Sequence, residues 1–267
     1  MNYLDELEAE SIYIFREAYK KLERLSMLWS IGKDSNTMLW LARKAFYGNI
    51  PFPIVHIDTS YKIPEMIEFR DEFVKKWQLD LIIGQNKKSL LEGMNHEKGR
   101  VVCCSALKTE GLKQTLEQHN LKSVFAGIRR DEEGTRAKER VFSPRDSEEK
   151  WDVKNQPPEF WNQYKTDFKA GTSIRIHPLL QWTELDIWRY IERENIPVVS
   201  LYFANKDGFR YRSLGCRPCT FPIKSNAATV SEIVKELENT KQSERAGRAQ
   251  DSESEGAFEK LRQEGYM

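Results

Sequence analysis

Short apolar runs alternate with amphipathic stretches along the first two thirds of the chain. Residues 4–25 carry apolar side chains at close to helical spacing, and the mostly apolar run 26–30 ends just before Gly32. Residues 36–46 then return to helical spacing. An apolar run, a tight turn and an amphipathic stretch in this order predict a strand followed by a helix.

The same alternation continues to about residue 200. We predict strands at 54–58, 79–83, 123–127 and 173–177, and helices at 64–77, 105–118 and 183–193. Residues 131–169 are irregular, because they contain prolines and many charges. Strands that alternate with helices predict an α/β fold with an open, mostly parallel sheet and helices on both faces.

We expect the chain to divide into two units. Residues 1–200 form the nucleotide-binding α/β domain, and residues 201–267 form a C-terminal extension that packs on it and carries Cys216 and Cys219. Within this extension, residues 241–255 contain no apolar side chain larger than alanine. Such a polar stretch is typical of a loop or of a segment that becomes ordered on binding.

Composition narrows the class of protein. The 267 residues are 39% hydrophobic and 31% charged, which is enough apolar material for a large core. Lys and Arg number 42 against 41 Asp and Glu, so a net charge of +1 provides no bulk attraction to nucleic acid or membrane. The apolar runs are far shorter than the roughly 20 residues of a membrane helix, and the acidic N-terminus lacks a signal region. We therefore expect a soluble, cytoplasmic protein with reduced thiols.

The turn between the first predicted strand and its helix has the composition of an anion site. It reads Ser-Ile-Gly-Lys-Asp-Ser over 30–35. Gly32 lets backbone N–H groups approach an anion, Ser30 and Ser35 can donate hydrogen bonds, and Lys33 supplies a positive charge. An ordinary strand-to-helix turn with a capped helix is the alternative.

This turn resembles the PP-loop of the ATP pyrophosphatases, which split ATP between its α and β phosphates. Within that superfamily the chain resembles the phosphoadenylylsulfate reductase group, and especially the small subunit of bacterial sulfate adenylyltransferase. The resemblance is carried by residues 7–12, 30–35, 41–46, 51–53, 56–59, 127–133, 136–140, 182–188, 201–204 and 243–248. It implies an adenine nucleotide alpha-hydrolase-like fold that binds ATP with Mg²⁺.

The resemblance also implies which residues act. The implied nucleotide-binding residues are Ser30, Gly32, Lys33, Asp34, Ser35, Asp58 and Gly127, and the implied catalytic residues are Lys33, Asp34, Arg129, Arg130 and Asp131. The two arginines follow a predicted strand, where a pair of guanidinium groups could hold a phosphate. A solvated charged loop is the other interpretation of this segment. His56 is better interpreted as a core histidine.

The four cysteines form a second pattern. Cys103 and Cys104 are adjacent, and Cys216 and Cys219 follow far downstream. This set resembles the [4Fe-4S] ligands of assimilatory adenylylsulfate reductases, with zinc as the rival metal and an inert buried group as the remaining alternative. The chain departs from those reductases because its C-terminal segment has no further cysteine to act as the sulfur nucleophile.

The loop 30–35 and the four cysteines together lead to an interpretation of the function. We favour an ATP pyrophosphatase that adenylates an oxyanion acceptor for sulfur incorporation into DNA, because the ATP pyrophosphatases of DNA phosphorothioation systems combine this loop with such cysteines. The implied partners are a cysteine desulfurase or another sulfur donor, DNA that another subunit could present, and a second copy of the chain. Two alternatives stay open: a small subunit of sulfate adenylyltransferase that makes adenylylsulfate, and a non-catalytic nucleotide-binding subunit.

Overall fold

The computed structural model describes residues 2–134, 136–146, 149–161, 163–169, 172–242 and 244. Most of the predicted polar stretch 241–255 and of the segment 243–248 therefore lies outside the described residues. None of the described helices is both long enough and apolar enough to cross a bilayer.

A six-stranded sheet runs through the described part of the chain, in the strand order β3-β2-β1-β4-β6-β5. Its strands are β1 (Leu25–Leu28), β2 (Ile54–Ile57), β3 (Leu81–Gly84), β4 (Ser123–Phe125), β5 (Phe142–Arg145) and β6 (Ser173–Ile176). All neighbouring strands are parallel except β5 and β6, which are antiparallel. The predicted open, mostly parallel sheet is confirmed.

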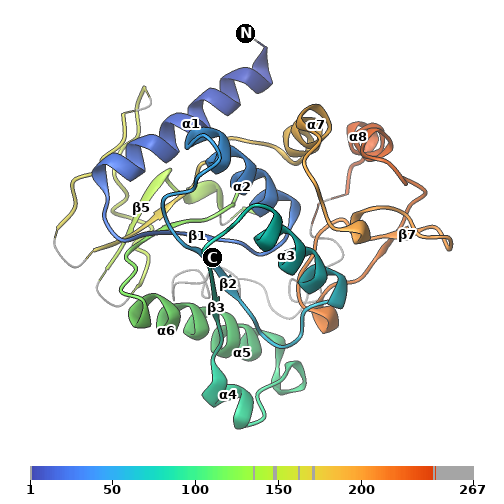
Figure 1. The fold of residues 1–267 in the computed structure, drawn as a ribbon, viewed down its shortest axis with the longest axis horizontal. Coiled ribbons are helices and arrows are strands. Elements are labelled where there is room, and N and C mark those ends of the chain that lie inside the picture. The colour runs from blue at the N-terminus through green and yellow to red at the C-terminus, as the bar shows by residue number, and fades with distance from the viewer. Residues whose placement is uncertain are drawn as a thin grey trace.

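Helices cover both faces of this sheet. They are α1 (Tyr3–Lys21), α2 (Lys33–Ala45), α3 (Pro64–Lys76), α4 (Lys87–Leu91), α5 (Arg100–Cys104), α6 (Glu110–Gln118), α7 (Glu184–Glu194) and α8 (Val230–Asn239). A π-helical turn, η2 (Ser105–Thr109), joins α5 to α6, and short 3-10 turns lie at His96–Lys98, Arg136–Lys138, Ser200–Tyr202 and Arg217–Cys219. In Figure 1, α1 and α2 lie on one side of the strands and α5 and α6 on the other.

The apolar runs of the strands are explained by burial on both faces. Side chains alternate along a strand, so Met27 contributes to the core beneath α1 and α2, whereas Leu28 contributes to a second core beneath α6. The register that pairs Met27 with Ile54 and with Phe125 brings these three side chains into the same core. A strand that is buried on both faces is continuously apolar rather than alternating.

The structure contains elements that the sequence did not predict, among them a strand at the edge of the sheet and three elements of the C-terminal extension. The segment predicted to be irregular contains β5, which includes Pro144 and lies at the edge of the sheet, where a residue without an N–H is tolerated. The C-terminal extension contributes a hairpin of β7 (Phe209–Arg210) and β8 (Ile223–Lys224), followed by α8, which lies beside α7 (Figure 1). The division into two units near residue 200 stays a prediction.

Candidate active site

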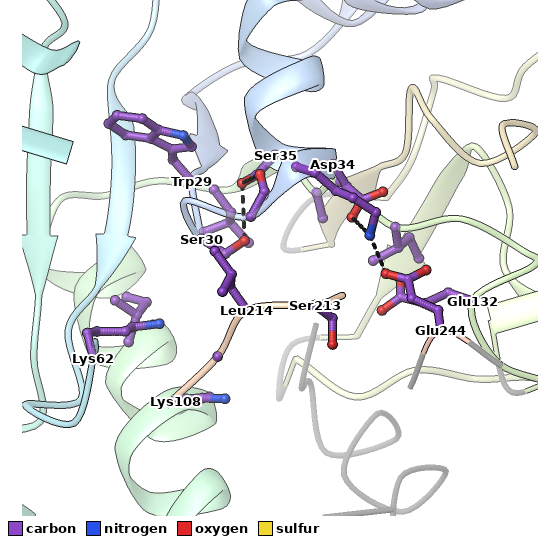
Figure 2. A pocket seen from close by; sticks show the side chains of 18 of the residues that line it. Trp29, Ser30, Asp34, Ser35, Lys62, Lys108, Glu132, Ser213, Leu214 and Glu244 are labelled. Atoms are coloured by element: carbon purple, nitrogen blue, oxygen red, sulfur yellow. Dashed lines mark hydrogen bonds and ion pairs between the residues drawn. The ribbon is translucent and has the colours of Figure 1, made fainter. Parts of the chain in front are cut away.

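A pocket opens at the carboxyl ends of β1, β2 and β4, where an open α/β sheet binds its ligands. Residues 30–35, the predicted phosphate loop, form one wall, and residues 213–215 of the C-terminal extension form another. Figure 2 shows Asp34, Glu132 and Glu244 gathered at one end, while Lys62 and Lys108 lie at the opposite end. The pocket is therefore built from segments that are far apart in the sequence.

The phosphate loop is held by hydrogen bonds between its own residues. The hydroxyl oxygens of Ser30 and Ser35 are 3.1 Å apart, and the Ser35 hydroxyl donates to the Gly32 carbonyl at 3.0 Å. The left-handed backbone conformation falls on Ile31, with φ of 67°, and not on Gly32, with φ of −76°. This conformation is unfavourable for a β-branched residue, and the complete burial of the Ile31 side chain helps to maintain it.

The position that requires a glycine is instead Gly127, just beyond β4. A Cβ atom there would be 3.3 Å from the backbone nitrogen of Ser35 and 3.4 Å from the carbonyl carbon of Asp34. These are backbone atoms of the first turn of α2, and they cannot rotate away. Gly127 thus lets the end of β4 approach the phosphate loop closely.

Lys33 is the cation of the loop, and it is 1% exposed. Its backbone N–H donates to the hydroxyl of Tyr202 at 2.8 Å, which ties the start of α2 to the C-terminal extension. Its ammonium group lies 3.2 Å from an Asp34 carboxylate oxygen and also forms an ion pair with Glu244. A charge buried to this extent requires such partners.

Arg129 is the second buried cation, and three carboxylates surround its guanidinium. Its Nε donates to Asp131 at 2.9 Å, and it forms further ion pairs with Asp34 and Glu244. Burial by itself would lower the pKa of Arg129, but the charge of Glu244 and the other carboxylates more than compensates and raises it. Asp131 also accepts from the backbone N–H of Glu184 at 2.7 Å, so the first turn of α7 helps to hold the arginine.

Glu244 is the functional candidate that sequence reasoning missed. Its carboxylate is buried and bridges Lys33 and Arg129. Burial would raise the pKa of this carboxyl, but the charges of Arg129 and Lys33 outweigh burial and hold the pKa far below its usual range. The only signal in the sequence was that residue 244 lies within the segment 243–248, one of those that carry the family resemblance.

Two predicted site residues lie elsewhere. Asp58 is not among the residues that line the pocket, and its carboxylate accepts from the backbone N–H of Ser60 at 2.8 Å. Arg130 donates to the backbone carbonyl of Glu139 at 3.3 Å and lines a separate hollow with Arg140. The structure therefore brings Ser30, Gly32, Lys33, Asp34, Ser35 and Gly127 into the pocket, with Arg129 and Asp131 behind it.

The four cysteines line a small neighbouring cavity. All four are buried and none forms a disulfide. Burial, together with the other three thiols, raises the pKa of Cys103 to about 12. Among the described residues, no three or more His, Cys, Asp or Glu side chains are grouped so as to hold a metal ion.

The cysteine cavity adjoins the pocket at one residue. Lys108 lines both spaces. A β-bridge between Lys62 and Cys216, and a hydrogen bond of 2.7 Å from the N–H of Arg217 to the carbonyl of Tyr61, attach the C-terminal cysteines to the segment after β2. The predicted metal ligands therefore lie beside the pocket and not within it.

Comparisons with known proteins give the family and the fold. The profile of the phosphoadenosine phosphosulfate reductase domain matches residues 24–222. Sulfate adenylyltransferase subunit 2 of Aeromonas salmonicida is 47% identical over 100% of this chain and 96% of that protein. Among solved structures, the phosphoadenylyl-sulfate reductase of Candida auris matches with a TM-score of 0.58 and 17% identity, over 83% of this chain and 98% of that chain. The Candida glabrata FMN adenylyltransferase in complex with ATP matches with a TM-score of 0.57 and 20% identity, over 82% and 63%.

The family match and the full-length relatives define an adenylyl-transfer enzyme of the PP-loop superfamily, and the solved structures match its adenine nucleotide alpha-hydrolase-like sheet. The two solved structures support the fold alone, because their identities to this chain are low. The chain belongs to the phosphoadenosine phosphosulfate reductase domain family, among the proteins named sulfate adenylyltransferase subunit 2.

The preference for DNA phosphorothioation was wrong. Relatives that match the whole chain at 45–47% identity carry the name that was given as the alternative. The preference depended on the cysteines, whereas the loop and the sheet are shared across the superfamily and do not distinguish one acceptor from another. The predicted DNA and cysteine desulfurase partners depended on this preference and are no longer supported.

Proposed function

We propose that this chain transfers AMP from ATP to sulfate, as a subunit of a sulfate adenylyltransferase. The observation that carries the proposal is the full-length similarity to subunit 2 proteins, supported by a pocket in which a phosphate loop with a buried lysine faces an open cavity. The products are adenylylsulfate and pyrophosphate.

The pocket has suitable groups for each part of ATP. Apolar side chains of Leu28, Val55 and Ile57 line it, and they offer a dry surface to a purine base. Apart from the N–H of Lys33, which donates to Tyr202, the first backbone N–H groups of α2 have no acceptor within the helix, and the positive end of the helix favours the phosphates. Lys33 stands in that first turn.

In the proposed reaction, a sulfate oxygen attacks the α-phosphorus while the bond from that phosphorus to the β-phosphate oxygen breaks. Negative charge grows on the departing pyrophosphate, and Lys33 and the loop amides are placed to stabilise it. The proton balance needs no general base, because sulfate is already deprotonated at neutral pH. Catalysis therefore depends on positioning and on charge.

Magnesium would enter with the ATP phosphates and neutralise part of the charge on the leaving pyrophosphate. Asp34 is the residue of the phosphate loop that would hold it, because its carboxylate lines the pocket beside Lys33. An oxygen donor at this place suits a hard cation.

Sulfate-dependent exchange of labelled pyrophosphate into ATP tests the proposal. Lys33→Ala should lower the exchange rate by about 100-fold, because one charge that stabilises the leaving group is lost. Lys44→Ala is the matched control, since Lys44 lies on the same helix but pairs with Glu8 and Glu194. Nucleotide binding without any exchange would instead favour a non-catalytic subunit.

The name of the relatives implies at least one further subunit, and we propose that this chain acts with one. The exchange assay should therefore be run on protein purified from its own host and on the isolated chain. Activity only in the host preparation is the expected result. A cytoplasmic location fits this proposal and stays a prediction.

We further propose that the four cysteines hold a [4Fe-4S] cluster. They come from α5 and from the turn Arg217–Cys219 with its flanking Cys216, yet all line one cavity. A single zinc ion bound by the four thiolates is the rival assignment. A cubane binds each cysteine to a different iron, so its ligands need only surround a shared space.

Anaerobic purification followed by iron, sulfide and zinc analysis tests this second proposal. We expect about four irons and four sulfides per chain with a broad visible absorption, and loss of colour in Cys216→Ser. Ser105→Ala, next to the cysteine pair but outside the cavity lining, is the control. Zinc, or protein without metal, would leave the cysteines as a structural contact.

A further inference from the structure

Glu244 occupies the place where the proposed reaction needs an anion to bind. Its two carboxylate oxygens accept from the Lys33 ammonium and from the Arg129 guanidinium. Lys33 lines the pocket and Arg129 lies behind it, and both are buried. A carboxylate held between a lysine and an arginine uses the same donors as a phosphate oxygen.

The charged groups that pair with one another around Glu244 disfavour a phosphate beside it. Two cations, Lys33 and Arg129, are surrounded by three carboxylates, those of Asp34, Asp131 and Glu244. This cluster already has a formal charge of −1, and an incoming pyrophosphate would meet like charge at close range in a site with little water. Without Glu244 the cluster is neutral, and the two cations can accept an anion.

The chain also keeps Glu244 close to its site. Two residues earlier, the carbonyl of Gln242 accepts from Arg212 at 2.9 Å, and Arg212 is itself paired with Glu184 at 2.7 Å. A carboxylate tethered this close has a high effective concentration at the cations. It therefore competes with a free anion in solution and returns when that anion leaves.

We propose that Glu244 is an internal anion that fills the phosphate subsite at Lys33 and Arg129 and leaves it when pyrophosphate or the phosphate chain of a nucleotide binds. The inference rests on the proposed function, because it takes the loop to be an ATP site. It adds a regulatory element. While Glu244 occupies the subsite, the protein binds polyphosphates weakly, because the incoming anion must displace the carboxylate.

Calorimetric titration with sodium pyrophosphate, without sulfate or nucleotide, tests the inference. Glu244→Gln keeps the shape of the side chain and removes its charge, so we expect it to bind pyrophosphate about tenfold more tightly than the unaltered protein. Glu236→Gln is the matched control, because Glu236 also pairs with a buried arginine, Arg210, but lies outside the pocket. It should bind as the unaltered protein does.

Equal or weaker binding by Glu244→Gln would overturn the inference and would make Glu244 a residue that positions the two cations. Absence of binding in both proteins would overturn it as well. Because the titration needs neither sulfate nor turnover, tighter binding without sulfate-dependent exchange would contradict the proposed function and leave the competition intact.

A second measurement uses the unaltered protein and does not depend on a variant that folds. Hydrogen exchange of a peptide containing Glu244 should become faster when pyrophosphate is added, because the carboxylate has left its buried site. A peptide from α8, which ends at Asn239, is the internal control and should not change. Slower exchange around Glu244 on addition of pyrophosphate would overturn the inference.

Discussion

At the scale of single residues, neighbours in the sequence differ sharply in their surroundings. Arg129 is fully buried among carboxylates of the site, whereas Arg130 reaches the carbonyl of Glu139. Both lie beyond the end of β4, Arg129 in a loop and Arg130 in a turn, so no strand geometry sets the direction of their side chains. The sequence predicted that the segment after β4 contributes to the site. Which of the two arginines faces the phosphate loop was decided by the tertiary structure.

Gly127 gives a prediction at the same scale. Gly127→Ala would place a methyl group against backbone atoms of Ser35 and Asp34, so α2 would have to move from the end of β4. We expect a loss of stability of about 1–3 kcal/mol and weaker ATP binding, measured by urea denaturation and calorimetry.

Gly134→Ala is the control for that substitution, because a Cβ atom at Gly134 would have no neighbour within 4 Å. Unchanged ATP binding by Gly127→Ala would show that the close approach of β4 does not shape the site.

At the scale of elements, the local pattern predicted most of the sheet. The strands and helices that were predicted up to α7 fall near their expected places, because apolar spacing reports which face of an element is buried. The predicted helix 105–118 is the instructive exception, since its first five residues form the π-helical turn η2, and α5 precedes it. The edge strand β5 was missed because Pro144 and nearby charges hide its pattern.

The N-terminal cap of α7 gives a prediction about stability at the scale of elements. Thr183 caps this helix and exchanges hydrogen bonds with Asp186, and the next N–H donates to Asp131 in the site. Thr183→Ala removes the capping oxygen and should lower the free energy of unfolding by about 1 kcal/mol. Thr183→Ser keeps the hydroxyl and should behave like the unaltered protein in urea denaturation. Equal stability of all three proteins would contradict the capping role.

At the scale of the whole molecule, one buried histidine links stability to pH. His56 is fully buried in β2, as interpreted from the sequence, with Nδ1 2.8 Å from the Trp29 carbonyl oxygen. Burial, with the charge of Lys62, lowers its pKa from 6.5 to about 3. The unfolded chain therefore binds a proton between these values that the folded protein does not bind. Stability should fall as the pH decreases from 6.5 towards 3.

The contribution of His56 appears in the slope of the free energy of unfolding against pH. In His56→Asn, the free energy of unfolding should depend less on pH in this window, by up to about 1.4 kcal/mol per pH unit. His119→Asn replaces an exposed histidine and should keep the original slope. Identical slopes for all three proteins would mean that His56 is not buried in its neutral form.

The sequence by itself determined the α/β class, the alternation of strands and helices, and the phosphate loop with Lys33. These are local properties, since burial on one or two faces and the chemistry of a six-residue turn are written in neighbouring residues. The resemblance also predicted the correct enzyme class, but the cysteines led to a wrong prediction of the acceptor.

Only the tertiary structure decided how distant residues meet. Glu244 lies 211 residues from Lys33 and 115 from Arg129, and no local pattern marks one glutamate among many as the partner of both. The cysteine cavity and the contact of Tyr202 with the phosphate loop are likewise products of the chain returning to the sheet. Such contacts follow from the packing of the whole chain, because the partners are selected by shape and charge in space and not by spacing in the sequence.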